Sequence, residues 1–120
     1  MMKYNVHYVG THVVGTTGST TENMREYLDL VSTGQVDPAF MISHVGGINA
    51  VIDTTLNLPT LPGAKKLIYN HIEMPLTAIN DLEKLGESNP SYAQLAELVA
   101  ANNGLWGVEA EKFLLANSPA

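Results

Sequence analysis

The strongest constraint on the fold is the stretch HVVGTTGSTTENMREYLDLVSTG at residues 12–34, where an apolar segment runs directly into a helical pattern. Gly15 and Gly18 permit a tight turn, and the hydroxyl-bearing residues that follow can cap a helix. Either Ser19 or Thr20 is expected to be that cap. A strand that turns into a helix in this way is typical of α/β proteins.

The helix predicted after this turn is amphipathic and ends at Gly34. Glu22 lies three residues after Ser19, which is the spacing of a capping box. Apolar residues then recur at the spacing of one helix face: Met24, Tyr27, Leu28 and Val31.

Glycine and proline divide the rest of the chain into further elements. Residues 3–9 and 11–16 are rich in Val, Tyr, His and Thr and predict two short strands. Residues 36–44 and 64–71 predict two more strands, with a turn at the pair Gly46-Gly47 after the first of them. A short helix is expected between these strands, and its predicted buried stripe is Ile48, Val51, Ile52 and Leu56.

The last fifty residues are rich in helix formers and predict three helices. The first carries Leu76, Ile79, Leu82 and Leu85; the second follows the cap Asn89-Pro90; the third covers roughly residues 107–116. We therefore expect an α/β fold, in which a β-β-α-β-α-β unit is followed by three C-terminal helices. The expected division is a mixed segment, residues 1–70, and a helical tail, residues 71–120.

Composition excludes several classes of function. The 120 residues carry twelve acidic and six basic side chains, a net charge of -6, so nucleic acid and anionic membrane surfaces are not expected partners. There is no cysteine, and hence no disulfide or thiolate metal site. No apolar run is long enough to span a membrane. We expect a soluble cytoplasmic protein.

The turn at residues 15–18 does not match a phosphate-binding motif. Gly10 and Gly15 have the outer spacing of a P-loop, but Thr16 occupies the position of the required lysine, and no G-x-G-x-x-G is present. Unpaired N–H groups at a helix start can still hold a polar ligand. The alternative is that the glycines and hydroxyls only form the turn and the cap.

The remaining polar candidates are histidines and lysines. His44 ends an apolar strand and is either a cleft residue or a structural histidine, and Ser43 is expected on the opposite face of that strand. Lys65 and Lys66 are the only adjacent bases, either solvated or in contact with an anionic ligand. No H-x-x-x-H pair is present. We assign no catalytic residue and no metal ligand.

Residues 6–70 resemble the C-terminal part of the medium-chain zinc-dependent alcohol and polyol dehydrogenases. That family has a strand ending G-S-x-G-G, then N-x-E-D, a helix, G-x-(I/V)-x-P, (L/F)-(I/V)-T-H, a helix beginning I-N-x-A, and a G-K strand. The corresponding segments here are GTTGS (15–19), TTEN (20–23), GQVDP (34–38), MISH (41–44), INAV (48–51) and GAK (63–65). The helical tail is most similar to the sorbitol and sorbose-phosphate dehydrogenase branch.

The resemblance implies specific roles. Gly15, Thr16 and Thr17 would end the Rossmann sheet, with backbone contacts to the nicotinamide carboxamide, and Lys65 would approach the cofactor diphosphate. Thr17 departs from the bulky residue that the family often has there. The helix after them would return the chain to the catalytic lobe, whose end is formed by the strands at His44 and Lys65.

The resemblance also implies what this chain lacks. The family holds its zinc in an N-terminal lobe and its pyrophosphate on a glycine-rich loop, and neither is encoded here. We expect a fragment of an NAD- or NADP-dependent zinc dehydrogenase, inactive alone, whose partner is the remainder of the enzyme or another copy in a homo-oligomer. The alternatives are a stand-alone module that binds a partner chain or small polar ligand, and an unrelated enzyme that uses His44 and nearby hydroxyls.

Overall fold

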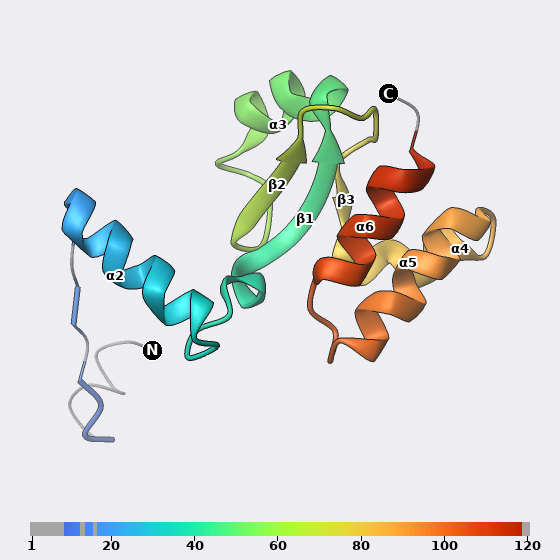
Figure 1. Cartoon of the computed structure of the whole chain (residues 1–120). Coiled ribbons are helices and arrows are strands. Elements are labelled where there is room, and N and C mark those ends of the chain that lie inside the picture. Colours follow the sequence, from blue (N-terminus) through green and yellow to red (C-terminus); the bar gives the residue numbers. More distant parts are fainter. Residues whose placement is uncertain (1–8, 13, 16, 119–120) are drawn as a thin grey trace. The chain divides into compact units, whose positions relative to one another are not determined.

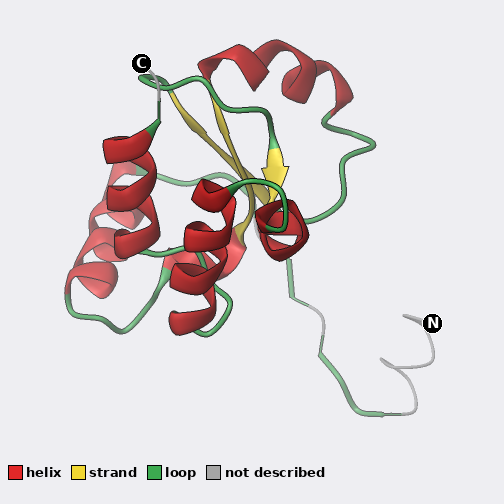
Figure 2. Ribbon diagram, turned by 90° about the vertical axis from the view of Figure 1, so that its right-hand side faces the viewer, coloured by secondary structure: helices red, strands yellow, loops and turns green. Residues whose placement is uncertain are grey.

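The computed structural model describes residues 9–12, 14–15 and 17–118, and the chain divides into two compact units, Met1–Val36 and Asp37–Ala120 (Figure 1). The first unit contains helix α2 (Thr21–Ser32) and the second contains a small sheet with the other helices (Figure 2). The predicted α/β class is confirmed. The predicted division at residue 70 refers to lobes of a larger enzyme and stays a prediction.

The segment before α2 does not form the predicted strand at residues 11–16, because none of its described residues is in a strand. Val14 is 91% exposed, and an extended segment without a paired neighbour is not stable as a strand. Of the strand predicted at residues 3–9, only Val9 lies within the described residues, and it is not in a strand.

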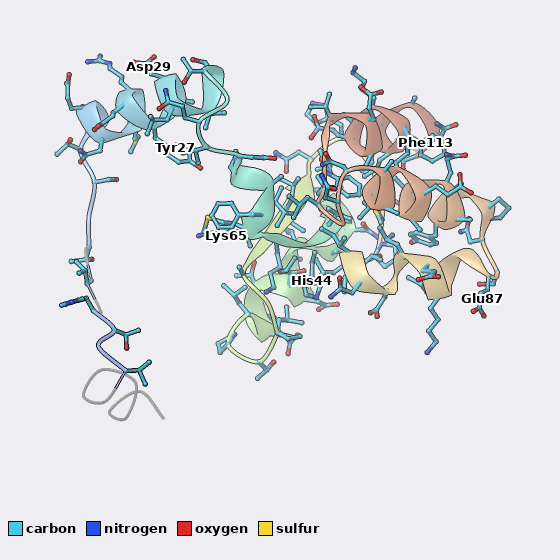
Figure 3. All side chains as sticks on the ribbon, turned by 90° about the horizontal axis from the view of Figure 1, so that it is seen from below. Tyr27, Asp29, His44, Lys65, Glu87 and Phe113 are labelled. Atoms are coloured by element: carbon cyan, nitrogen blue, oxygen red, sulfur yellow. The ribbon has the colours of Figure 1, made fainter. Side chains whose placement is uncertain are left out.

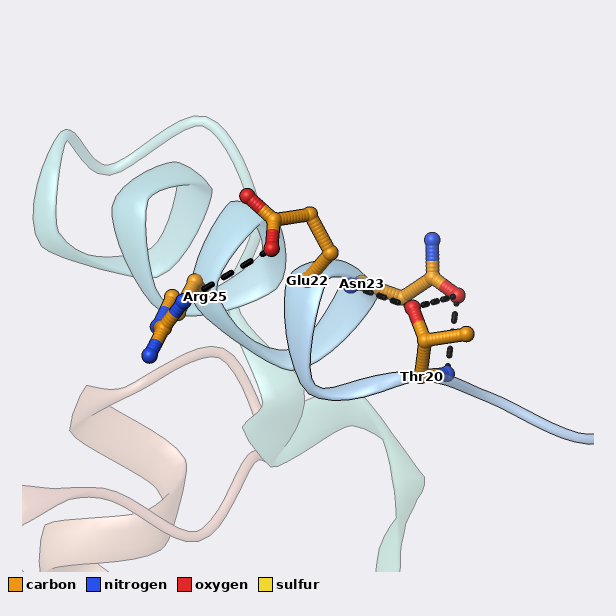
Figure 4. A network of polar contacts seen from close by, with 4 residues as sticks. All are labelled: Thr20, Glu22, Asn23 and Arg25. Carbon is orange, nitrogen blue, oxygen red and sulfur yellow. Dashed lines mark hydrogen bonds and ion pairs between the residues drawn. The ribbon is translucent and has the colours of Figure 1, made fainter.

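Helix α2 is capped by Thr20 through a reciprocal pair of hydrogen bonds (Figure 4). The backbone N–H of Asn23 donates to the Thr20 hydroxyl over 3.3 Å, and the Thr20 N–H donates to the Asn23 side-chain oxygen over 3.0 Å. Glu22, the predicted partner in the capping box, instead lies 3.6 Å from Arg25 in an exposed ion pair. An amide oxygen at the third helical position therefore takes the place of a carboxylate.

The end of α2 is as predicted, but its apolar stripe is not covered. Gly34 has a φ of 71°, a left-handed conformation that favours glycine at a helix end. None of the helix residues is buried, and Leu28 is 64% exposed.

The sheet of the second unit has three strands in the order β2-β1-β3: β1 (Ile42–Gly47), β2 (Lys65–Tyr69) and β3 (Thr77–Ala78). β1 and β2 are parallel and are joined by η2 (Ile48–Ala50) and α3 (Val51–Asn57), whereas β3 is antiparallel to β1. The strand predicted at 64–71 is confirmed as β2. The two-residue strand β3 was missed, since so short a segment has no periodicity to detect.

The strand predicted at 36–44 begins later and ends later than expected. Pro38 starts a 3-10 helix, η1 (Pro38–Met41), because its fixed φ suits a first helical position and Asp37 accepts a bond from the Ala39 N–H over 2.9 Å. β1 then continues through Gly46 and Gly47, so the turn predicted at this pair is wrong.

The glycine pair serves close backbone packing instead of a turn. A Cβ on Gly47 would lie 2.4 Å from both the Ile72 oxygen and the Met74 nitrogen. The Gly47 N–H donates to the Met74 carbonyl over 2.8 Å, and the Ile48 N–H donates to the Ile72 carbonyl over 3.0 Å. The segment around residues 72–76 can therefore lie directly against the end of β1 only because no side chain intervenes.

The three predicted C-terminal helices are confirmed as α4 (Leu82–Gly86), α5 (Pro90–Ala101) and α6 (Val108–Asn117). The predicted first helix is shorter than its apolar stripe, because Leu76 precedes β3 and η3 (Ile79–Asp81) leads into α4. Asn89 caps α5 by accepting a hydrogen bond from the Ser91 N–H over 3.0 Å.

One face of the sheet, here called the helical face, packs against α4, α5 and α6. Leu67 and Tyr69 project from β2 toward this side. The Tyr69 hydroxyl donates to Glu111 on α6 over 2.6 Å and accepts a bond from the Trp106 indole N–H over 2.9 Å. The buried cluster consists of Val45, Ile72, Met74, Ile79, Leu82, Leu95, Val99, Trp106, Ala110 and Leu114.

The opposite face, here called the α3 face, is covered more thinly. The stripe predicted to be buried on the second helix is largely exposed, and that prediction is wrong: the exposed members are Ile48, Val51, Ile52 and Leu56. The buried residue of α3 is Thr54, at 7% exposure. No described helix is long and apolar enough to cross a membrane.

Candidate functional site

The candidate site is a groove of about 410 Å³ between α3 and the start of β2. The groove exists because the connection from β1 to β2 places a helix over the sheet and brings the chain back through a proline- and glycine-containing turn. Val51, Thr54 and Leu58 line one side, and Lys65 and Ile68 line the other.

The two adjacent lysines have different environments. Lys66 is half-buried, and its ammonium donates to the carbonyls of Pro62, Gly63 and Ala64 over 2.6, 3.0 and 3.1 Å. Lys65 is exposed at the groove and its side chain forms no hydrogen bond or ion pair with any described residue (Figure 3). Lys66 therefore stabilises the turn before β2, and Lys65 keeps an uncompensated charge.

Ser43 and His44 form a hydrogen-bonded pair at the start of β1. The Ser43 hydroxyl lies 3.1 Å from the Lys65 carbonyl oxygen and 3.0 Å from His44 Nδ1. We expected these two side chains on opposite faces of the strand, which is wrong. A register irregularity between Ile42 and His44 breaks the normal alternation, as an extra residue in a bulge does.

The direction of the Ser43–His44 bond depends on the tautomer of the imidazole. When the Ser43 hydroxyl donates to the Lys65 carbonyl, His44 donates from Nδ1 to the Ser43 oxygen. Burial, and then the nearby Lys66 charge, lowers the pKa of His44, while Asp81 opposes them. The lowered pKa favours the neutral imidazole of His44.

Gly63 allows this arrangement. Its φ is +78°, and a Cβ there would lie 2.6 Å from the Cβ and Oγ of Ser43. A larger residue would push the turn away from the serine and open the groove.

Thr54 is a groove residue that the sequence analysis missed. Its hydroxyl oxygen is buried and has no hydrogen-bond partner in the described part of the chain. The sequence shows Thr54 only as a polar residue beside the apolar stripe of this helix. Such a residue is normally expected to face solvent, so the pattern does not identify it as a groove residue.

The predicted cofactor residues lie in both units. Gly15 and Thr17 are exposed in the segment before α2, Thr16 lies outside the described residues, and Lys65 lies on β2. The shared cofactor contact of these four residues therefore stays a prediction. Within the described residues no group of three His, Cys, Asp or Glu could hold a metal, so these residues do not fit a zinc centre.

Comparison with known proteins adds three relatives. The chain is 54% identical over 113 residues to the uncharacterized protein YggP of Escherichia coli, which is 94% of this chain and 27% of that protein. It is 50% identical over 112 residues to the mannitol-1-phosphate 5-dehydrogenase of Aliivibrio fischeri, which is 93% of this chain and 26% of that enzyme. It is 40% identical over 115 residues to the L-sorbose 1-phosphate reductase of Klebsiella pneumoniae, which is 96% of this chain and 26% of that enzyme.

Nearly the whole chain is homologous to one part of the polyol-phosphate dehydrogenases. The resemblance to the polyol dehydrogenases that was inferred from the motifs is thereby confirmed. The chain spans about a quarter of the length of the curated relatives it matches, 26–27% in each case. No family model matches it, and no solved structure matches it.

Proposed function

We propose that this chain forms part of the cofactor-binding wall of an NAD(P)-dependent, zinc-type dehydrogenase of polyol or sugar phosphates. The observation that carries the proposal is the uncompensated Lys65 charge at the groove beside α3. The matched enzymes are named a mannitol-1-phosphate 5-dehydrogenase and an L-sorbose 1-phosphate reductase, which supports a sugar or polyol phosphate as substrate.

In this proposal the residues of this chain bind the cofactor and position it. The Lys65 ammonium is a point charge that can neutralise a phosphate oxygen of the cofactor. Gly15, Thr16 and Thr17 offer backbone groups to the nicotinamide carboxamide. The cofactor, when bound, supplies the hydride-transfer chemistry. Because no cluster of the described residues fits a metal, the zinc ligands would come from other parts of the enzyme. This sequence has no G-x-G-x-x-G, so the pyrophosphate loop would also come from elsewhere, and we expect no turnover by this chain alone.

The test uses a hybrid enzyme in which this chain replaces the matched 112 residues of the Aliivibrio fischeri dehydrogenase. Lys65→Ala in the hybrid is expected to raise the KM for the cofactor about tenfold or more, which corresponds to the loss of one charge-assisted bond of about 1.5–3 kcal/mol. Lys65→Arg should restore most of the affinity, because the charge is kept.

Lys66→Ala is the matched control, because that lysine is engaged by three carbonyls. It should lower the thermal stability of the hybrid and leave the cofactor KM nearly unchanged. An unchanged KM in Lys65→Ala would refute the cofactor role of Lys65. Turnover of mannitol 1-phosphate by the 120-residue chain with NAD or NADP would refute the proposal that this chain alone is inactive.

A second candidate function is a stand-alone module that binds a partner chain, and the exposed apolar side of α3 favours it. An inactive hybrid that contains correctly folded segments would support this second candidate. An active hybrid supports the dehydrogenase.

A further inference from the structure

The chain has its only Asn-Gly pair, Asn103-Gly104, directly after the C-terminal end of α5. Both residues have left-handed φ values, 58° and 79°, and Asn103 is the only described residue other than glycine with a positive φ. Asparagine and glycine adopt this conformation more readily than other residues, which explains their position at a helix end. The same pair brings a side-chain amide next to a backbone nitrogen that no side chain shields.

The two residues can react with each other. The Gly104 backbone nitrogen attacks the side-chain carbonyl carbon of Asn103, and the bond from this carbon to the amide nitrogen breaks. The proton lost by the Gly104 nitrogen leaves with the amide nitrogen as ammonia, and a five-membered succinimide ring remains. One water molecule then opens the ring at either carbonyl, which gives an aspartyl or an isoaspartyl residue. The reaction therefore needs water but no enzyme and no partner chain.

Hydrogen bonds at the end of α5 hold this reaction back. The Gly104 N–H donates to the Val99 carbonyl over 2.9 Å, and the Asn103 N–H donates to the Ala100 carbonyl over 3.2 Å. The Asn103 side chain, by contrast, forms no hydrogen bond or ion pair with any described residue. Helix ends open at a small free-energy cost compared with the core, so the last turn of α5 can release the Gly104 nitrogen without global unfolding.

We propose that Asn103-Gly104 is a spontaneous deamidation site, and that opening of the last turn of α5 sets its rate. The product carries a carboxylate at the C-terminal end of the helix, where the helix dipole already places partial negative charge. The last turn of α5 has no basic residue, and Asp37 and Glu109 line the groove beside Asn102. The modification therefore destabilises the end of α5 that leads into α6.

The main experiment incubates the purified 120-residue chain at mildly alkaline pH and follows the peptide that contains Asn103 by mass spectrometry. We expect aspartyl and isoaspartyl products at Asn103, and no change at Asn89, because the following Pro90 has no backbone N–H to attack. In guanidinium chloride the reaction should be about tenfold faster, because the hydrogen bonds of the last turn are lost. Absence of modification at Asn103 in the folded chain would overturn the proposal.

Ala100→Gly tests the control by helix opening. Ala100 lies in the last turn of α5, and glycine is a weaker helix former, so deamidation should become about three- to fivefold faster. Gln94→Gly is the matched control, because Gln94 lies near the middle of the same helix. It should leave the rate within about twofold of that of the unsubstituted chain, since it does not open the last turn. Equal acceleration by both variants, or equal rates in the folded and the denatured chain, would overturn this control.

Two variants at Asn103 separate the reaction from its consequence. Asn103→Asp reproduces one product and should lower the melting temperature by about 1–5 °C, because of the charge at the helix end. Asn103→Gly removes the reacting amide and keeps a residue suited to the left-handed conformation, so it should abolish the modification without loss of stability. An unchanged melting temperature of Asn103→Asp would overturn the proposed destabilisation, and undiminished ammonia release from Asn103→Gly would overturn the assignment of the site.

Discussion

The two faces of the small sheet pack against helices whose apolar residues have the same i, i+4 spacing but lie in different environments. On the helical face, α5 buries Leu95 and Val99 within a continuous apolar cluster. On the α3 face, Ile52 and Leu56 occupy similar helical spacing and remain exposed. The difference shows that an apolar stripe predicts an amphipathic helix with one apolar face. Whether this chain or another surface covers that face is decided by the neighbouring elements.

The largest expected effect separates the two faces directly. Leu95→Ala should lower the free energy of unfolding by about 2–5 kcal/mol, because it leaves a cavity in the cluster, where Leu95 is 2% exposed. Leu56→Ala should cost less than about 0.5 kcal/mol. Urea denaturation of the isolated chain measures both. Equal losses would show that the α3 face is as well packed as the helical face.

Gly47→Ala should cost about 1–3 kcal/mol, because the new methyl group collides with backbone atoms of residues 72–74. The collision would separate β1 from the segment that leads to the helical face. Gly15→Ala is the control, because no atom of the described residues, its chain neighbours aside, lies within 4 Å of the added Cβ and its φ is not left-handed. Similar denaturation midpoints for both variants would contradict the close-packing explanation.

Tyr69→Phe should cost about 1–3 kcal/mol, since it leaves the buried Trp106 N–H without an acceptor. Tyr92→Phe is the control: Tyr92 is half-buried against the same cluster, and its hydroxyl bonds to no other described residue. Thermal unfolding distinguishes them. A loss in Tyr92→Phe as large as that in Tyr69→Phe would mean that ring packing, and not the hydroxyl, joins β2 to α6.

The same tyrosine gives the helical face a dependence on alkaline pH. Burial, and then the hydrogen bond to Glu111, raises the pKa of Tyr69 above its ordinary value of 10.0. The unfolded chain therefore loses this proton first, so stability is full below pH 10.0 and falls as the pH rises above it. Tyr69→Phe should remove this part of the pH dependence.

On the α3 side, Lys66→Ala should cost about 0.5–1.5 kcal/mol, because three turn carbonyls lose their donor. Lys65→Ala should be neutral in the isolated chain. Chemical denaturation of both variants measures the difference. Equal effects would contradict the assignment of Lys66 to the turn and of Lys65 to a ligand.

The smallest effect concerns His44, whose pKa is lowered in the folded chain. The unfolded chain takes up a proton first as the pH falls, so stability is full above the ordinary value of 6.5 and declines below it. His44→Asn should flatten this decline, because it removes the titrating group. A pH profile of unfolding measures the difference, and identical profiles for the variant and the unsubstituted chain would refute the role of burial at His44.

Local chemistry made several elements predictable. Asn89 and Pro90 identified the start of α5, Gly34 identified the end of α2, and β-branched and apolar residues identified β2. Capping and left-handed glycine are decided by residues a few positions apart, which a sequence displays directly. The motifs also pointed correctly to the polyol dehydrogenases.

Sequence therefore sufficed for most of the helices, for β2 and for the resemblance to the polyol dehydrogenases, whereas tertiary structure decided which surfaces meet. Gly47 is a close-packing position because residues 72–76 return to β1, and Ser43 meets His44 because the strand register is irregular. Lys65 and Lys66 differ because only one reaches the turn. Each of these outcomes depends on groups brought together from distant or irregular backbone, which no local pattern encodes.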